Sequence, residues 1–136
     1  MFEVFEHTAD IGLRIRARTL PDLFADAARG LFSLLVENPE AIEPKSEWSC
    51  HLQADQLDLL LFDWLNELLY RFDCEHWLMT KFAIQIEGTS LTARCHGEPL
   101  DLKRHRLDHE VKAITYHDLK LEATADGYLA EVILDI

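Results

Sequence analysis

Short runs of alternating apolar and polar residues mark the strands that this chain is expected to form. In residues 12–18, Leu13, Ile15 and Ala17 point to one face and three arginines point to the other. Residues 45–53 alternate in the same way, with apolar side chains at every second position. Because successive side chains of a strand point to opposite faces, both runs predict strands that bury one face.

The C-terminal half of the chain predicts two β-hairpins. The first joins residues 82–86 to residues 91–95 across a short polar turn. The second joins residues 119–123 to residues 128–134 around Asp126-Gly127, a strong signal for a two-residue turn. The last of these strands runs to the end of the chain.

Two longer segments carry apolar residues at spacings of three and four, which is typical of helices with one buried face. The first begins at Thr19, a suitable N-cap residue, with Pro21 in the first turn and Asp22 at the capping-box position. Asn38-Pro39 is expected to end this helix. Its apolar stripe consists of Leu20, Leu23, Phe24, Ala27, Ala28, Leu31, Phe32 and Leu35.

The second helical segment is expected to begin after Asp55 as its N-cap, with Asp58 three residues later. Its apolar face is wide, which favours burial against a sheet and against another helix. The main stripe consists of Leu57, Leu60, Leu61, Trp64, Leu65, Leu68, Leu69 and Phe72, and Leu59, Phe62 and Tyr70 widen it.

The predicted order is strand, helix, strand, helix and then two hairpins. This order indicates an α+β fold, in which a mainly antiparallel β-sheet carries two amphipathic helices packed on it. The chain has 136 residues, of which 49% are hydrophobic, so we expect residues 1–136 to form a single domain with its own core. No glycine-rich phosphate-binding motif follows a strand, which argues against a nucleotide-binding α/β fold.

The sequence also bears on the compartment in which the protein works. The longest wholly apolar run, Leu59 to Phe62, is far too short to cross a bilayer. The N-terminus lacks the basic and then apolar segments of a secretory signal. Cys50, Cys74 and Cys95 are odd in number and widely spaced, which argues against disulfides and cysteine-ligated zinc. We therefore expect a cytoplasmic protein without membrane association.

The net charge of −12 comes from carboxylates spread along the whole chain. Such a surface repels phosphate backbones, so direct binding of nucleic acid is disfavoured. It suits a basic protein partner or divalent cations, although solubility alone also explains such a charge. Arg14, Arg16 and Arg18 share one predicted strand face. Pairing with nearby carboxylates is the favoured interpretation of these arginines, and binding of an anion is the alternative.

A polar motif, His7-Thr8-Ala9-Asp10-Ile11-Gly12, lies between two apolar runs near the start of the chain. Buried polar groups need partners, so Asp10 is expected to face a backbone amide, a cation or a metal ion. Asp135 and the terminal carboxylate of Ile136 are candidates to share such a metal, and a set of oxygen ligands favours Ca²⁺ or Mg²⁺ over zinc. The alternative is that Asp10 caps a turn while Asp135 lies exposed at a frayed end.

Residues 100–118 break the alternation and hold three of the seven histidines. Long irregular connections in a compact domain are often functional. Lys112 lies between Val111 and Ala113, so its stem is expected to pack while its ammonium reaches a polar site, with an ordinary surface lysine as the alternative. A zinc site is a further hypothesis, although no zinc motif is present; its ligands would come from His105, Asp108, His109, Glu110, His117 and Asp118.

Three separated motifs of this chain resemble those of the archease family, and the resemblance covers essentially all of the sequence. They are the motif of residues 7–12, the segment of residues 110–117 and the ending of residues 133–136. Residues 57–73 resemble the second helix of the family, and residues 97–99 resemble its approach to the irregular loop. His109 departs from the family pattern, in which a small or hydroxylated residue is more common.

The resemblance implies an accessory protein and not an enzyme. Archeases assist the GTP-dependent tRNA-splicing RNA ligase of the RtcB type, because they promote guanylylation of its active-site histidine and repeated turnover. The metal site of the family, often occupied by calcium, would correspond to Asp10, Asp135 and the carboxylate of Ile136. The lysine that the family requires would correspond to Lys112, and His7 belongs to the same motif as Asp10.

Two other classes of function stay open. The family has also been linked to chaperone-like support of a tRNA methyltransferase, a role that would not need Lys112. The third class is a metal-dependent hydrolase that acts alone, but the sequence offers no convincing nucleophile and no general base with a positioned partner. We therefore expect an activator of the RNA ligase that has no activity by itself.

Overall fold

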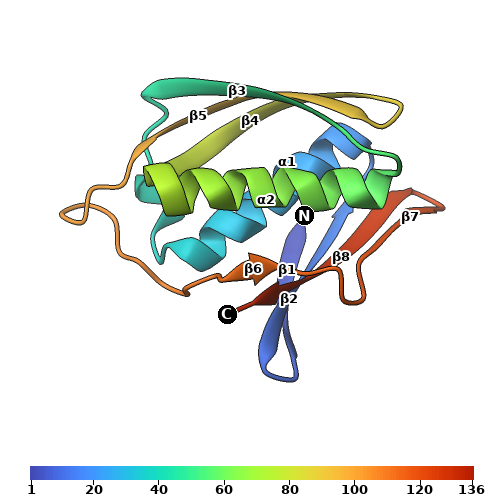
Figure 1. Cartoon of the computed structure of the whole chain (residues 1–136), viewed down its shortest axis with the longest axis horizontal. Coiled ribbons are helices and arrows are strands. Elements are labelled where there is room, and N and C mark those ends of the chain that lie inside the picture. Colours follow the sequence, from blue (N-terminus) through green and yellow to red (C-terminus); the bar gives the residue numbers. More distant parts are fainter.

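Two antiparallel sheets enclose two helices in the computed structural model, which describes residues 1–136 (Figure 1). The larger sheet has the strand order β1-β2-β8-β6. Strands β6 and β7 both pair with the same edge of β8, β7 with its first half and β6 with its last two residues. The strands of this sheet are β1 (Phe2–His7), β2 (Asp10–Ala17), β6 (Ala113–Ile114), β7 (Lys120–Thr124) and β8 (Gly127–Asp135).

The smaller sheet has the strand order β3-β5-β4. Its strands are β3 (Ser46–Gln53), β4 (Trp77–Glu87) and β5 (Ser90–Pro99). The register of β4 against β5 shifts between Met79 and Lys81, next to Gly97 of β5. A Cβ atom on Gly97 would lie 1.8 Å from the carbonyl oxygen of Leu78, so only glycine allows the two backbones to approach this closely.

Helix α1 (Leu20–Leu35) begins as the sequence predicts. Thr19 is its N-cap, and the side-chain oxygen of Thr19 accepts a hydrogen bond from the backbone N–H of Asp22 at 3.2 Å. The helix ends at Leu35, earlier than expected, and the proline starts a separate 3₁₀ turn, η1 (Pro39–Ala41). Proline disrupts a continuing helix but fits the first turn of a new one, which explains the split.

Helix α2 (Leu57–Glu75) has a different start from the predicted one. Its N-cap is Gln56, so the assignment of Asp55 as the cap is wrong. Asp58 instead accepts a hydrogen bond from the N–H of Leu59, its neighbour in the first turn. The helix ends at Glu75, and its C-cap residue, His76, adopts the left-handed conformation with φ of 58°. Neither helix of the protein is long and apolar enough to cross a membrane.

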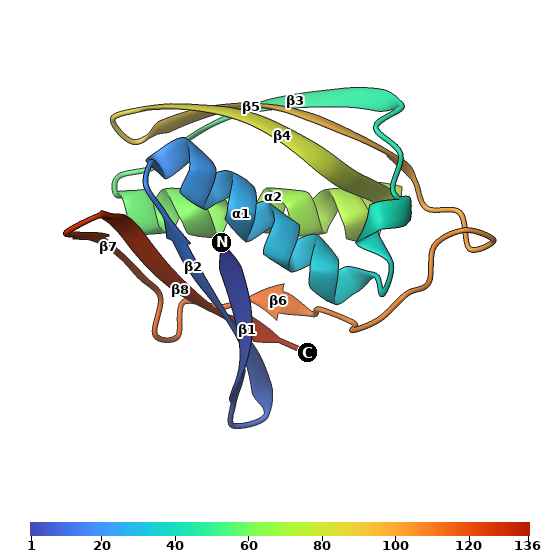
Figure 2. The same ribbon diagram turned by 180° about the vertical axis from the view of Figure 1, so that it is seen from behind.

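Both helices lie between the two sheets, as opposite views of the molecule show (Figures 1 and 2). One cluster of 29 buried residues joins all of these layers. The indole of Trp64 on α2 is fully buried and donates a hydrogen bond to the carbonyl of Phe24 on α1 at 3.0 Å. The predicted α+β class is confirmed, with two antiparallel sheets where a single sheet was expected. The wide apolar face of α2 explains this difference, because a helix with such a face needs cover on more than one side.

Candidate functional site

The polar motif near the start of the chain forms the turn of a hairpin. His7 ends β1 and pairs directly with Asp10, the first residue of β2. Thr8 and Ala9 make the connection, and Thr8 has a positive φ of 54°. The hairpin is not predictable from this motif, because Thr and Ala are not typical residues for so tight a turn.

The register of the larger sheet brings Asp10 next to Asp135. Strand β2 pairs with β8 so that Ile11 lies opposite Leu134, and both of these side chains are buried. Asp10 comes just before Ile11 and Asp135 just after Leu134, so the continued antiparallel register sets the two aspartates opposite one another, on the other face of the sheet. The hairpin turn and the end of β8 accordingly lie at the same end of the larger sheet (Figures 1 and 2).

Lys112 and Ile136 lie beside this pair of aspartates. The backbone N–H of Lys112 donates a hydrogen bond to the carbonyl of Asp135 at 2.7 Å, and Ala113 of β6 pairs with Asp135. Lys112 is exposed, which leaves its ammonium accessible, and the packing of its stem stays a prediction. The side chain of Ile136 is partly buried against the core. We call Asp10, Lys112, Asp135 and Ile136 together the carboxylate end of the larger sheet.

The oxygen atoms that the carboxylate end offers as metal ligands suit a hard cation. Asp10 is half-buried and Asp135 is exposed, and no lysine, arginine or histidine side chain forms an ion pair with either. Like charges directly opposite one another on adjacent strands are destabilising. Carboxylate oxygens are the preferred ligands of Ca²⁺ and Mg²⁺, so a bound divalent cation would relieve this repulsion. The ligand set of Asp10, Asp135 and the Ile136 carboxylate stays a prediction, with a backbone arrangement that suits it.

His7 lies next to Asp10 but turns to a different part of the chain. Its Nε2 is 3.3 Å from Oδ2 of Asp118, and its ring centroid is 5.3 Å from that of His117. The other ring nitrogen, Nδ1, is buried without a hydrogen-bond partner. His7 therefore makes its polar contacts through Nε2, with the loop between β6 and β7.

The zinc hypothesis for residues 100–118 does not hold as a single site. His105 is buried and lies 3.1 Å from the carboxylate of Glu98, whereas His109 is exposed with Asp108 4.0 Å away. His117 and Asp118 lie 3.3 Å apart, but no third member of the proposed set joins them. The sequence could not separate these histidines, because their positions depend on how the loop folds back onto the sheets.

Glu98 holds the start of this loop through a buried charge network. Its carboxylate accepts hydrogen bonds from the Arg104 guanidinium, from the N–H of Glu43 at 2.6 Å and from His105. Nδ1 of His105 accepts a bond from the N–H of Asp101, so Nε2 is the nitrogen that carries a proton toward Glu98. Burial alone would raise the pKa of Glu98, but these donors outweigh it and bring the pKa to about 2.

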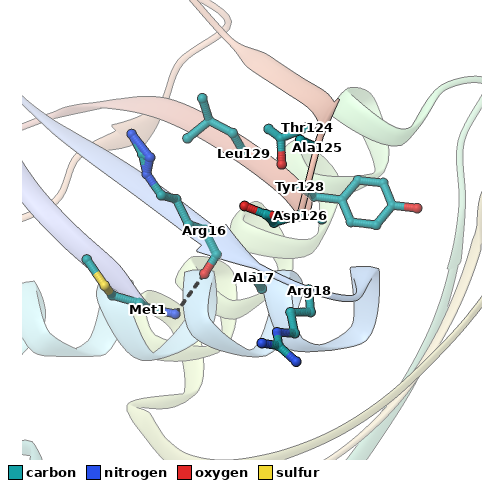
Figure 3. A pocket seen from close by; sticks show the side chains of 10 residues that line it. Met1, Arg16, Ala17, Arg18, Thr124, Ala125, Asp126, Tyr128 and Leu129 are labelled. Carbon is teal, nitrogen blue, oxygen red and sulfur yellow. Dashed lines mark hydrogen bonds between the residues drawn. The ribbon is translucent and has the colours of Figure 1, made fainter.

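The arginine face of β2 contributes to a hollow at the far end of that strand. Arg14 pairs with Glu3 at 3.3 Å and with Glu131 at 3.2 Å, which confirms for this residue the expected pairing with carboxylates. Arg16 and Arg18 border a hollow of about 490 Å³ with Asp126 of the β7–β8 turn (Figure 3). None of the predicted site residues lines this hollow. The hollow is therefore not part of the carboxylate end.

Comparison with protein families gives one match over almost the whole chain. Residues 2–136 match the model of the archease protein family (MTH1598/TM1083). Protein archease of Pyrococcus furiosus is 39% identical to this chain, and the similarity covers 99% of this chain and 98% of the relative. Protein archease of Methanopyrus kandleri is 36% identical, with coverage of 99% of each chain.

Two solved structures have a similar fold. The solution structure of protein 1598 of Methanobacterium thermoautotrophicum has a TM-score of 0.84 at 32% identity, and covers 99% of this chain and 98% of its own. The crystal structure of TM1083 of Thermotoga maritima, described as an archease and possible chaperone, has a TM-score of 0.67 at 23% identity. That comparison covers 100% of this chain and 98% of the other, and it supports the fold alone.

Proposed function

Because the chain belongs to the archease family, we propose that it activates the GTP-dependent tRNA-splicing RNA ligase of the RtcB type through the carboxylate end of the larger sheet. The observation that carries the proposal is the register of β2 against β8. It sets Asp10 opposite Asp135, although the two residues lie near opposite ends of the sequence. The backbone of Lys112 is bonded to the same residue, Asp135.

The charge of the protein supports action on an enzyme and not on RNA. A net charge of −12 repels the phosphate backbone of RNA. An enzyme that binds RNA and GTP must carry positive surface around those ligands, and an acidic partner suits such a surface. The chain would therefore act on the ligase protein at the guanylylation step, and not by holding the RNA.

Each residue of the carboxylate end has a role in this proposal. Asp10, Asp135 and the carboxylate of Ile136 would hold Ca²⁺ or Mg²⁺, which when bound supplies a positive centre for anionic groups. The exposed ammonium of Lys112 supplies a second positive charge beside it, which suits contact with a nucleotide phosphate or with an acidic group of the ligase. The hairpin turn projects at this end of the sheet and is accessible to a partner (Figure 1).

The test is guanylylation of the cognate ligase with labelled GTP, together with the number of ligated RNA molecules per ligase. The unaltered protein should raise both quantities and show no ligation alone. Asp135→Asn and Lys112→Ala should abolish the stimulation while the melting temperature stays within a few degrees. Asp126→Asn and Lys103→Ala are matched controls, since both residues are exposed and lie outside the carboxylate end. Full stimulation by Asp135→Asn and Lys112→Ala would refute the proposed surface.

A chaperone-like role toward a tRNA methyltransferase is the second candidate. One observation favours it, namely that the structurally similar Thermotoga maritima protein is described as a possible chaperone. The same variants separate the two functions. A chaperone that shields apolar surface of its client would not need Lys112, so Lys112→Ala would keep that activity and lose ligase stimulation.

A further inference from the structure

We infer that His7, His117 and Asp118 form a second metal site, which suits a transition metal such as Zn²⁺ or Co²⁺ and shares no ligand with the neighbouring carboxylate end. One ligand atom from each residue lies within 4.8 Å of the other two. His7 comes from the end of β1, whereas His117 and Asp118 come from the loop that joins β6 to β7. The inference rests on these three side chains and does not depend on the function proposed above.

The distances within this cluster fit ligands that surround one ion. Oδ2 of Asp118 lies 3.3 Å from Nε2 of His7 and 3.3 Å from Nε2 of His117. Charge-assisted hydrogen bonds are shorter, at about 2.7–2.9 Å. In a tetrahedral zinc site with bonds of about 2.0–2.1 Å, neighbouring ligand atoms lie about 3.3 Å apart. The two distances to Asp118 therefore match the spacing of neighbouring metal ligands, and the two histidine ligand atoms lie within 4.8 Å of one another, close enough to share one ion.

The loop is held in this shape by contacts outside the cluster. The hydroxyl and the N–H of Thr115 each donate to the carbonyl of Ile133 at 3.0 Å, and the N–H of His117 donates to the same hydroxyl at 3.3 Å. The ring of Tyr116 stacks on Phe62 of α2, with centroids 3.8 Å apart. Ligands on a backbone that is already ordered need less reorganisation to bind a metal.

The ligand types of this cluster favour a different metal ion from the one that the carboxylate end favours. Two imidazole nitrogens and one carboxylate oxygen suit Zn²⁺, Co²⁺ or Fe²⁺, whereas Ca²⁺ and Mg²⁺ prefer oxygen ligands alone. The side chain of His7 is 27% exposed, and those of His117 and Asp118 are 65% and 64% exposed. The site is thus open to solvent on one side, which leaves room for a water molecule as a fourth ligand.

The backbone conformation of Asp118 decides which substitution tests its carboxylate alone. Its φ is 52°, in the left-handed region that Asp and Asn tolerate better than other residues with side chains. Asp118→Asn therefore removes the negative charge without changing the backbone preference. His117→Gln removes an imidazole at an exposed position, where little packing is lost.

The test is titration of the untagged protein with Co²⁺, in a Cys74→Ser background that removes the exposed thiol. The inference predicts one Co²⁺ per chain, with the strong visible absorption of four-coordinate cobalt, and displacement by Zn²⁺. His117→Gln and Asp118→Asn should each raise the Kd for Co²⁺ by about a hundredfold. Changing a residue that only hydrogen-bonds to a metal ligand already weakens metal binding by about 10–100-fold, and loss of a ligand itself should weaken it at least as much. His109→Ala, at an exposed histidine outside the cluster, and Asp135→Asn should bind as the background protein does.

Two results would overturn the inference. One is the absence of stoichiometric binding at millimolar Co²⁺ or Zn²⁺, which would leave the cluster as ordinary ion pairs. The other is unchanged binding by His117→Gln and Asp118→Asn. Loss of ligase stimulation by Asp135→Asn together with intact Co²⁺ binding would separate this site from the carboxylate end.

Discussion

Replacement of Glu98 by glutamine is expected to lower the free energy of unfolding by about 3 kcal/mol at pH 7. The pKa of Glu98 falls from an ordinary 4.5 to about 2 in the folded protein. Each tenfold change in proton affinity corresponds to about 1.4 kcal/mol, which gives the expected loss. Glutamine keeps the size of the side chain but loses the charge that Arg104 contacts, so the variant isolates the electrostatic contribution.

The dependence on pH has a definite sign. Glu98 has a lower pKa in the folded chain than in the unfolded chain, so its stabilising contribution is complete above about pH 4.5. The contribution is lost as the pH falls through the folded value of about 2. The difference in unfolding free energy between the unaltered protein and Glu98→Gln should therefore shrink by about 2 kcal/mol between pH 7 and pH 3.

Urea denaturation followed by tryptophan fluorescence at several pH values measures this difference. Glu87→Gln is the matched control, because Glu87 is exposed at the end of β4 and should change stability by less than about 0.5 kcal/mol. A loss below about 1 kcal/mol for Glu98→Gln at pH 7 would refute the reasoning. An equal loss at pH 7 and pH 3 would refute it as well, since the effect would then not come from the charge.

Three further predictions concern the core and the thiols. Gly97→Ala should lower the free energy of unfolding, measured by urea denaturation, by about 3 kcal/mol, because the added Cβ would lie 1.8 Å from the backbone oxygen of Leu78. A loss below about 1 kcal/mol would contradict the close approach of β4 and β5 at this residue. Trp64→Phe should cost about 2 kcal/mol by the same measurement, since it removes volume and the hydrogen bond from the indole to the Phe24 carbonyl. A neutral change would contradict that packing. A maleimide should modify the exposed thiol of Cys74 in the folded protein and leave Cys95 unmodified, because burial raises the pKa of Cys95 to about 12. Mass spectrometry that finds both cysteines modified would contradict this prediction.

Local patterns in the sequence predict the elements but not their arrangement. Thr19 caps α1 as expected, because an N-cap depends on residues that are adjacent in the chain. Alternation likewise predicts β3 and the two C-terminal hairpins. The two-residue strand β6 is too short to show a period, so the sequence gives no sign of it.

The residues of the candidate site illustrate the same limit. Asp10 and Asp135 are recognisable as candidate ligands in the sequence, but only the pairing of β2 with β8 brings them together. His117 and His105 fall in one segment of the sequence, whereas the folded loop buries His105 against Glu98 and carries His117 to His7. Long-range pairings of this kind depend on the whole fold, and a local pattern in one sequence does not contain them.

The most direct test of the central claim is a calorimetric titration of the protein with Ca²⁺. The account predicts one bound Ca²⁺ per chain for the unaltered protein and none for the Asp10→Asn/Asp135→Asn double variant. Asp126→Asn, with the charge removed at an exposed position outside the carboxylate end, should bind as the unaltered protein does. Equal Ca²⁺ binding by the double variant would contradict the claim that these two aspartates hold a cation.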